Sequence, residues 1–316
     1  MSLAEVVSSL NKEDCFLLTG HINPEGDAIG SSLALAEGLS RLGKKITLFS
    51  QDPIPELYRF LPGWEEFLNE LPGSEYALVL LDCSRRERAG IKQDAEFRKI
   101  VVIDHHETEC EPGSLCFIDS KSPATGMLVY EILKALGVKP TRTMAMNLYA
   151  AISTDTGIFR YDNTTPESLE VAAELVRAGA EPALISEKVY ETWTKERMSL
   201  LCLGLGSLEL RDGIAVMAIS RDMFEKTGTG LEDTEHFTIF PRMLKDVRVA
   251  AFMTEIERDV VKTSLRSKGD VNVREIAEKF GGGGHRKASG YRVKAPLEKA
   301  KEMLFKAAAD ALRSKD

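Results

Sequence analysis

The segment "CFLLTGHINPEGDAIGSSLALA", residues 15–36, joins an apolar run to an alanine-rich run through a short polar stretch. Residues 15–19 predict a buried strand, and the alanine-rich run predicts a helix that follows it. His21, Glu25 and Asp27 lie between these two elements. Because open α/β sheets bind ligands outside the carboxyl ends of their strands, charged side chains at this position indicate a functional site rather than a core.

Three further short apolar runs follow, at residues 46–50, 76–81 and 100–103, and helical patterns separate or follow several of them. This rhythm predicts an α/β fold with a parallel sheet and crossover helices. Helical periodicity then dominates from about residue 123 to 208. Within it, residues 165–178 have Pro166 near the start and are followed by Gly179, as expected of a capped helix.

A second, smaller α/β domain is predicted to begin near Arg211. Strands are expected at residues 213–220, 247–256 and 260–269, and helices at 271–280 and 296–313. We therefore expect a first domain at 1–190, a linker helix at 191–210 and a second domain at 211–316.

Composition limits the class of protein. With 316 residues, of which 43% are hydrophobic, the chain can bury one large core or two ordinary ones. No apolar run approaches the roughly 18 to 20 residues that span a bilayer, and the N-terminus lacks the pattern of a signal peptide. These features predict a cytoplasmic protein with no membrane segment. The net charge of -8 disfavours a long grip on nucleic acid, but allows small anionic substrates if metal ions supply positive charge.

The cysteines are odd in number and include no C-x-x-C pair. This pattern argues against a disulfide framework and against a zinc ribbon, so reduced structural thiols are expected. The five are Cys15, Cys83, Cys110, Cys116 and Cys202.

Further acidic and histidine residues fall where strands are predicted to end. Asp82 ends "YALVLLD", Asp104, His105 and His106 end "KIVVIDHH", and Asp155 lies in "AAISTDTG". If these groups converge with those of residues 21–27, their carboxylates would raise one another's pKa unless two divalent cations balanced the charge. Carboxylate and imidazole ligands without thiolate suit manganese, with magnesium as the alternative. Two such ions, about 3.5 to 4 Å apart, can clamp a phosphoryl group for in-line displacement.

Each residue also has a purely structural interpretation. Asp27 is well placed to cap the helix that follows it, and an isolated His-His pair is more often structural than catalytic. The combination favours a site, because four of the five histidines lie in polar segments of this kind and His236 alone does not. The four are His21, His105, His106 and His285.

The stretch "GGGGHRKASG", residues 281–290, is the second unusual feature. Glycines allow a phosphate to approach the backbone closely, and the following basic side chains add charge. A flexible linker, or a helix C-cap after Phe280, is the alternative. The candidate phosphate-binding residues are Gly282, Gly283, Gly284, His285 and Lys287, with Arg266 and Ser267 as weaker candidates that are equally consistent with a solvated surface pair.

Taken in order, "HINPEGDAIGS", "LDCS", "DHH", "STDTG" and "GGGGHRKASG" resemble the motifs of the DHH phosphoesterase family with its DHH-associated C-terminal domain. The resemblance covers nearly the whole chain, and the length and layout are similar to those of the bacterial nanoRNases and pAp phosphatases. It implies one metal on His21, Glu25 and Asp82 and a second on Asp27, Asp82, His105 and Asp155. His106 would face the scissile phosphate and Asp104 would orient a ligand histidine. The family most often has aspartate where this chain has Glu25.

The resemblance implies a manganese-dependent hydrolase with its active site in the cleft between the two domains. Its substrates would be short single-stranded RNA (nanoRNA) and small nucleotides such as 3'-phosphoadenosine-5'-phosphate (pAp). Hydrolysis of cyclic or linear dinucleotides such as pApA, and nucleotide sensing without catalysis, are the alternatives. A manganese pyrophosphatase fits less well, because that family has a different C-terminal domain. The oligomeric state is open, and a homodimer is compatible with the sequence.

Overall fold

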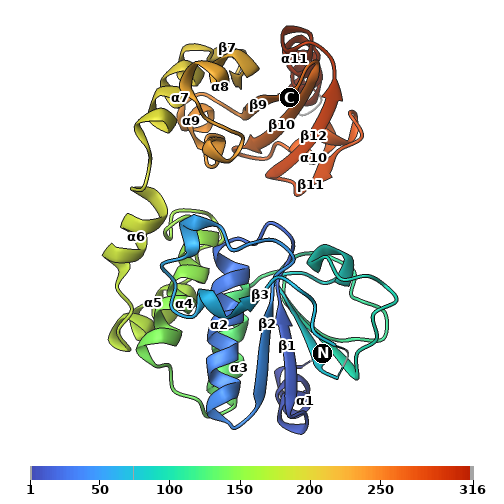
Figure 1. Ribbon diagram of the computed structural model, residues 1–316. Coiled ribbons are helices and arrows are strands. Elements are labelled where there is room, and N and C mark those ends of the chain that lie inside the picture. The colour runs from blue at the N-terminus through green and yellow to red at the C-terminus, as the bar shows by residue number, and fades with distance from the viewer. Residues whose placement is uncertain (1, 74, 314–316) are drawn as a thin grey trace. The chain divides into compact units, whose positions relative to one another are not determined.

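The computed structural model describes residues 2–73 and 75–313. The chain divides into two compact units, Met1–Thr192 and Trp193–Asp316. Each unit contains its own sheet (Figure 1). Both sheets have six strands, and each unit has an apolar core of its own. Among the described helices, none has both the length and the apolar character needed to cross a bilayer.

The first unit contains the predicted parallel sheet, with strand order β3-β2-β1-β4-β5-β6. All four predicted runs form strands, whereas β3 and β6 were not predicted because each is a short strand at an edge of the sheet. The strand order reverses between β1 and β4, and this switch point is where doubly wound sheets bind ligands. The strands are β1 Cys15–Thr19, β2 Lys45–Phe49, β3 Phe67–Leu68, β4 Ala77–Leu81, β5 Lys99–Asp104 and β6 Leu115–Ile118.

The two faces of this sheet are covered differently. Phe16 and Leu18 belong to the core that the helices share, whereas Leu17, which alternation along the strand points the other way, packs with residues of the β4–β5 connection. The prediction of crossover helices is confirmed for the β1–β2 connection, which contains the regular α-helix α2. The β4–β5 connection contains the short 3-10 helix η3 instead. The helices are α1 Leu3–Lys12, α2 Gly26–Arg41, α3 Thr125–Ala135, α4 Arg142–Asp155, α5 Pro166–Arg177, α6 Pro182–Tyr190, η1 Glu56–Tyr58, η2 Trp64–Glu66 and η3 Arg86–Ala89.

Helices α2 and α4 pack unusually closely. A Cβ atom at Gly30 of α2 would lie 2.3 Å from the carbonyl oxygen of Asn147 in α4, so a larger residue would push the two helices apart. The close α2–α4 packing matters for function, because α2 begins beside Asp27 and α4 ends at Asp155.

The predicted capped helix is α5, where the Thr165 side chain accepts the N–H of Ser168.

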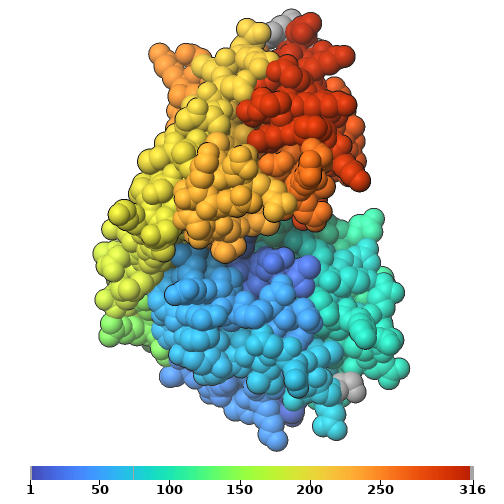
Figure 2. Space-filling model, turned by 45° about the horizontal axis from the view of Figure 1, so that its top comes forward, coloured from blue at the N-terminus to red at the C-terminus, as the bar shows by residue number. Residues whose placement is uncertain are grey.

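The second unit has a mixed sheet with the order β11-β12-β10-β9-β8-β7, in which β8 and β9 are parallel and the other neighbours antiparallel. The predicted strands and helices of this region are confirmed. The C-terminal helix α11, drawn in red, lies at the surface of the unit (Figure 2) and buries one face against the sheet. The elements are α7 Lys195–Gly206, β7 Glu209–Arg211, β8 Ile214–Ile219, α8 Arg221–Thr227, η4 Glu232–Thr234, α9 Ile239–Met243, β9 Val249–Glu257, β10 Val260–Ser267, α10 Val273–Glu278, β11 Gly283–Gly284, β12 Ala288–Lys294 and α11 Leu297–Arg313.

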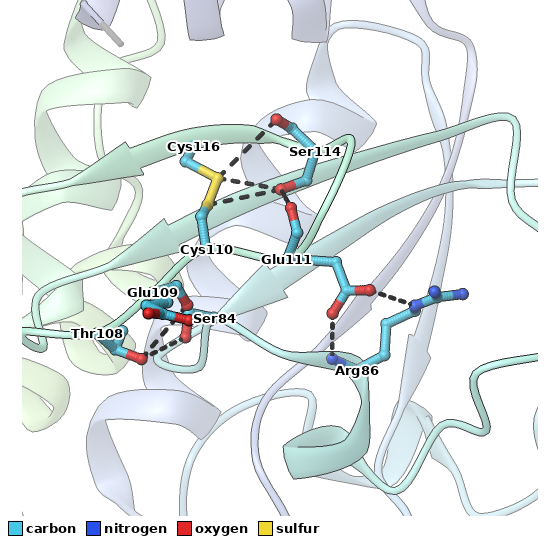
Figure 3. Close-up of a disulfide and its surroundings, with 8 residues drawn as sticks. All are labelled: Ser84, Arg86, Thr108, Glu109, Cys110, Glu111, Ser114 and Cys116. Carbon is cyan, nitrogen blue, oxygen red and sulfur yellow. Dashed lines mark hydrogen bonds and ion pairs between the residues drawn. A yellow bond between two sulfur atoms is a disulfide. The ribbon is translucent and has the colours of Figure 1, made fainter.

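The prediction that all the cysteines are reduced is wrong for one pair. Cys110 and Cys116 form a disulfide, with their Cα atoms 6.5 Å apart, between the loop after β5 and strand β6 (Figure 3). The enclosed Glu111 accepts the backbone N–H of Arg86 at 3.0 Å and its Nε–H at 2.9 Å. A count of cysteines could not reveal this pair, because tertiary structure decides which thiols meet. Cys15, Cys83 and Cys202 are free thiols.

Candidate metal centre

Three neighbouring strands of the first unit place polar residues at their carboxyl ends. His21 follows β1, Asp82 follows β4 directly, and Asp104 is the last residue of β5, immediately before His105 and His106. Since β1, β4 and β5 are adjacent and parallel, their carboxyl ends meet at the switch point. The convergence predicted for these residues is therefore present.

Asp82 has an uncommon backbone conformation. Its φ of 60° is left-handed, and its N–H donates to the carbonyl of Ile103 at 3.0 Å. A non-glycine residue in this region costs about 1 to 3 kcal/mol and persists where the surroundings hold it in place. The turn ends the strand and places the carboxylate among three histidines. Oδ2 lies 3.4 Å from Nε2 of His21, whereas Oδ1 lies 3.4 Å from Nε2 of His105 and 3.6 Å from Nδ1 of His106.

His105 lies at the centre of the cluster. Its Nδ1–H donates to the carbonyl of Ser122 at 3.2 Å, which directs Nε2 toward the carboxylates. Nε2 lies 3.3 Å from Asp155 Oδ2, 3.4 Å from Asp82 Oδ1 and 3.8 Å from Asp27 Oδ2. It is buried and has no hydrogen-bond partner of good geometry among the described residues. Metal-ligating histidines usually donate their other ring N–H to a carbonyl or carboxylate in this way.

Asp27 is buried, at 3% exposure, and holds the start of a different helix from the one expected. The sequence offered it as the cap of α2, but Glu25 occupies that N-cap position. Asp27 instead accepts the N–H groups of Thr125 at 2.6 Å and Gly126 at 2.8 Å, the first two residues of α3. The hydroxyl of Ser31 adds a third hydrogen bond at 3.1 Å.

Asp155 reaches the cluster from a helix and not from a strand end, which corrects the sequence prediction. It is the last residue of α4, and its carbonyl accepts a hydrogen bond from the Asn163 side chain at 3.2 Å. The same amide group donates to the carbonyl of Pro123 at 3.1 Å, just before α3. Asn163 thus ties the end of α4 to the start of α3.

The charges of this cluster perturb one another strongly. Burial, reinforced by Asp82 and Asp155, raises the pKa of Asp27 well above its ordinary value, and burial raises the pKa of Asp155 to about 6. The pKa of His105 rises to about 10, because Asp82, Asp27 and Asp155 outweigh the opposing effect of burial. The pKa of Asp82 is lowered, since its contacts with His105 and His21 overcome its burial. A protonated imidazole thus supplies the positive charge that these carboxylates require.

His106 is oriented by Asp104, which is fully buried. Oδ1 of Asp104 accepts the ring Nδ1–H of His106 at 2.8 Å and the backbone N–H of the same residue at 3.1 Å. This bond directs the other ring nitrogen, Nε2, away from Asp104. The aspartate therefore orients His106, and not the more central His105.

Two residue groups have ligand atoms close enough together to hold a metal ion. They are Asp82 with His105 and His106, and Asp27 with His105 and Asp155. His21 adjoins the first group through Asp82. Glu25 is exposed and belongs to neither group among the described residues, so its role as a ligand stays a prediction.

In the second unit, the glycine-rich stretch is neither a linker nor only a helix cap. Gly281, with φ 75°, ends the turn after α10, as the cap alternative proposed, and the residues that follow form a hairpin of β11 and β12. The turn of the hairpin is closed by hydrogen bonds between the backbones of His285 and Ala288, at 2.7 and 3.2 Å. His285 and Gly283 are exposed.

The other phosphate-binding candidates differ in position. Ser267 is buried, and its hydroxyl donates to the carbonyl of Val271 at 2.8 Å, which gives it a structural role. Arg266 pairs with Ala288 in the β10–β12 ladder, and Lys287 donates to the carbonyl of Gly269. The exposed part of the hairpin, with Gly283 and His285, is therefore a stronger candidate for phosphate binding than Arg266, Ser267 or Lys287.

Sequence reasoning missed the residues that support the ligands, namely Ser31, Ser122, Thr125, Gly126 and Asn163. One signal was present. Ala124 stands at the N-cap position of α3 and has no capping side chain, so the cap had to come from elsewhere in the chain.

Known proteins resemble this chain in both units. Residues 15–152 match the N-terminal domain of the DHH family, and residues 239–314 match the DHHA1 domain. The chain is 34% identical to the bifunctional oligoribonuclease and PAP phosphatase NrnA of Thermus thermophilus, over 98% of this chain and 93% of that protein. It is 30% identical to the Bacillus subtilis protein of the same name, over 90% and 91% of the two chains. An exopolyphosphatase-related protein from Bacteroides fragilis has the same fold, with a TM-score of 0.91 at 24% identity over 99% and 97% of the chains. With its motifs, its fold and its relatives in agreement, the chain belongs to the DHH family of phosphoesterases.

Proposed function

We propose that this protein is a divalent-metal-dependent hydrolase that cleaves short oligoribonucleotides and removes the 3'-phosphate of pAp. The observation that carries the proposal is the convergence of Asp27, Asp82 and Asp155 on Nε2 of His105 at the switch point of the sheet. The names of the two relatives support the choice of substrate, since both are called oligoribonuclease and PAP phosphatase.

The residues present fit a pair of divalent ions. Three buried or partly buried carboxylates converge on Nε2 of His105, which has no hydrogen-bond partner of good geometry among the described residues. Divalent ions would balance these carboxylates once that nitrogen has lost its proton. Oxygen and imidazole ligands favour manganese, with magnesium as the alternative. Asp82 is the best candidate for a bridging ligand, because its two oxygens face different histidines. Oδ1 of Asp82 would hold one ion together with His105, Asp27 and Asp155. Oδ2 of Asp82 would hold the other ion together with His21.

When bound, such ions would polarise the phosphoryl group and lower the pKa of water for in-line attack. The side chains have separate tasks. His106, fixed through Nδ1 by Asp104, would present Nε2 to the substrate and donate a hydrogen bond or a proton to the leaving oxygen. The exposed hairpin of the second unit would bind substrate phosphate through the imidazole of His285, and the lack of a side chain at Gly283 would let the phosphate approach the backbone closely.

A panel assay tests the proposal. Chelator-treated protein would be supplied with Mn²⁺, Mg²⁺ or Ca²⁺ and given pAp, pApA, RNA trimers, longer RNA or pyrophosphate, with products resolved by chromatography. We expect manganese-dependent release of nucleotide from RNA trimers and of phosphate from pAp, with weak action on longer RNA. Preference for pApA would indicate a dinucleotide phosphodiesterase. Nucleotide binding without turnover under any metal would indicate a sensor, and either result would overturn the proposal.

A further inference from the structure

Helix α3 begins without a cap of its own. Its N-cap residue is Ala124, which offers no side-chain acceptor, so the first backbone N–H groups of the helix need a partner from elsewhere. Asp27 provides it: Oδ2 accepts the N–H of Thr125 and Oδ1 accepts the N–H of Gly126. A negative charge at this end of the helix is also favoured by the helix dipole.

Thr125 makes a second contact, through its side chain. Its hydroxyl donates to Oδ1 of Asp82 at 3.0 Å, and the residue is fully buried. One residue therefore holds two carboxylates that come from distant parts of the chain, one through its backbone and the other through its hydroxyl. Hydrogen bonds to ionised acceptors are stronger than those between neutral groups, so both contacts restrict the carboxylates.

The two oxygens that Thr125 contacts are the same two that face His105. Oδ2 of Asp27 and Oδ1 of Asp82 lie 3.8 and 3.4 Å from Nε2 of His105. Thr125 thus donates a hydrogen bond to each of these two oxygens. In the metal-free protein, the protonated Nε2 of His105 faces the same two oxygens. The distance between the two oxygens depends on where α3 begins.

The neighbouring glycine allows this approach. A Cβ atom at Gly126 would lie 2.8 Å from Cβ of Ala151 and 3.4 Å from Oδ1 of Asp27. A larger residue would push the start of α3 away from Asp27 and from α4. Gly126 therefore lets the backbone reach the carboxylate, and Thr125 then reaches Asp82.

We propose that Thr125 is a positioning residue of the metal centre, whose hydroxyl fixes Oδ1 of Asp82 at a set distance from Oδ2 of Asp27. The inference rests on the proposed function, because it assigns Thr125 a role toward metals that Asp82 and Asp27 would hold. Thr125 itself does not need to contact substrate or metal. Its effect is to reduce the rearrangement that the carboxylates must undergo when a metal binds.

The test compares Thr125→Val, which keeps the shape and removes the hydroxyl, with Thr125→Ser, which keeps the hydroxyl. Binding of Mn²⁺ to chelator-treated protein would be measured by titration calorimetry and by the loss of the free-ion signal in electron paramagnetic resonance. We expect Thr125→Val to bind Mn²⁺ about 10- to 100-fold more weakly, as is typical when a ligand loses its outer hydrogen bond. Thr125→Ser should remain close to wild type.

Thr263→Val is the control for the loss of a buried threonine hydroxyl away from the metal centre. Thr263 is also fully buried but belongs to the sheet of the second unit. Thermal unfolding of the metal-free proteins would check that each variant folds. If folded Thr125→Val binds Mn²⁺ as tightly as wild type, or if Thr125→Ser loses as much affinity as Thr125→Val, the positioning role is wrong. If wild type itself fails to bind Mn²⁺, the proposed function fails first, so the two failures are distinguishable.

Discussion

Nε2 of His105 lies 3.3 Å from Oδ2 of Asp155, which places the residue after strand β5 against the last residue of helix α4. The sheet and the helical layer thus both contribute to one charged cluster. Because the pKa of His105 is raised to about 10, this contact is an ion pair at neutral pH in the metal-free protein.

Metal binding should therefore release protons. At about pH 8 the metal-free His105 is protonated, since this lies below its raised pKa, and Nε2 must lose that proton to become a ligand. Calorimetric titration with Mn²⁺ in buffers of different ionisation enthalpy should show release of about one proton or more. As the pH falls through about 6, Asp155 also becomes protonated and affinity should decrease further. A binding heat that is independent of the buffer would contradict this account.

Asp82→Asn should abolish hydrolysis while leaving the fold intact. Asparagine tolerates the left-handed backbone that Asp82 adopts, so the variant tests the charge and not the turn. Loss of a carboxylate that two metals would share should lower kcat by at least about a hundredfold, because metal catalysis contributes several kcal/mol. The measurement is kcat on pAp at saturating Mn²⁺, with circular dichroism to verify folding. Activity above about one hundredth of wild type would reject the bridging role.

The glycines of the hairpin should separate into structural and functional positions. A Cβ atom at Gly282 would lie 2.2 Å from the carbonyl oxygen of Gly290, whereas at Gly283 it would meet nothing within 4 Å. Gly282→Ala should therefore lower the melting temperature. Gly283→Ala should leave the melting temperature unchanged or slightly raised, yet increase KM for pAp, because a methyl group there obstructs a phosphate that approaches the backbone. An unchanged KM for Gly283→Ala would exclude close approach of substrate at that residue.

His285→Ala should weaken action on RNA trimers and pAp chiefly through KM. The exposed imidazole at the start of the hairpin turn is proposed to bind substrate, so its loss should spare the chemical step. Slow manganese-dependent hydrolysis of a generic phosphodiester, which has no second phosphate to bind, is the control and should be nearly unchanged. Equal loss on both substrates would place His285 in the chemistry or in the fold.

The Cys110–Cys116 disulfide predicts a thiol count. Protein denatured without reductant should react with a thiol reagent at the three free cysteines, and at all five after reduction. Cys110→Ser with Cys116→Ser should lower the melting temperature, because the loop that carries Glu111 loses its closure. Five reactive thiols before reduction would contradict the disulfide.

Many of the secondary-structure elements, with approximate bounds, could be predicted from the sequence. Short continuous apolar runs identified β1, β2, β4 and β5, because burial of a strand depends on its own side chains. The sequence also indicated the residues of the cluster, since several acidic residues and histidines together follow predicted strands. The edge strands β3 and β6 were not predicted because they have two and four residues, which is too short for a clear pattern.

Which side chains come into contact could not be read from the sequence. Asp27 looked like the cap of α2, its own helix, but it caps α3, and Asp155 reaches the cluster from the end of α4. The pairing of Cys110 with Cys116 and the contact of Thr125 with Asp82 were equally invisible. The physical reason is that periodicity and capping signals are local, whereas these contacts depend on how closely α2, α3 and α4 pack over the sheet.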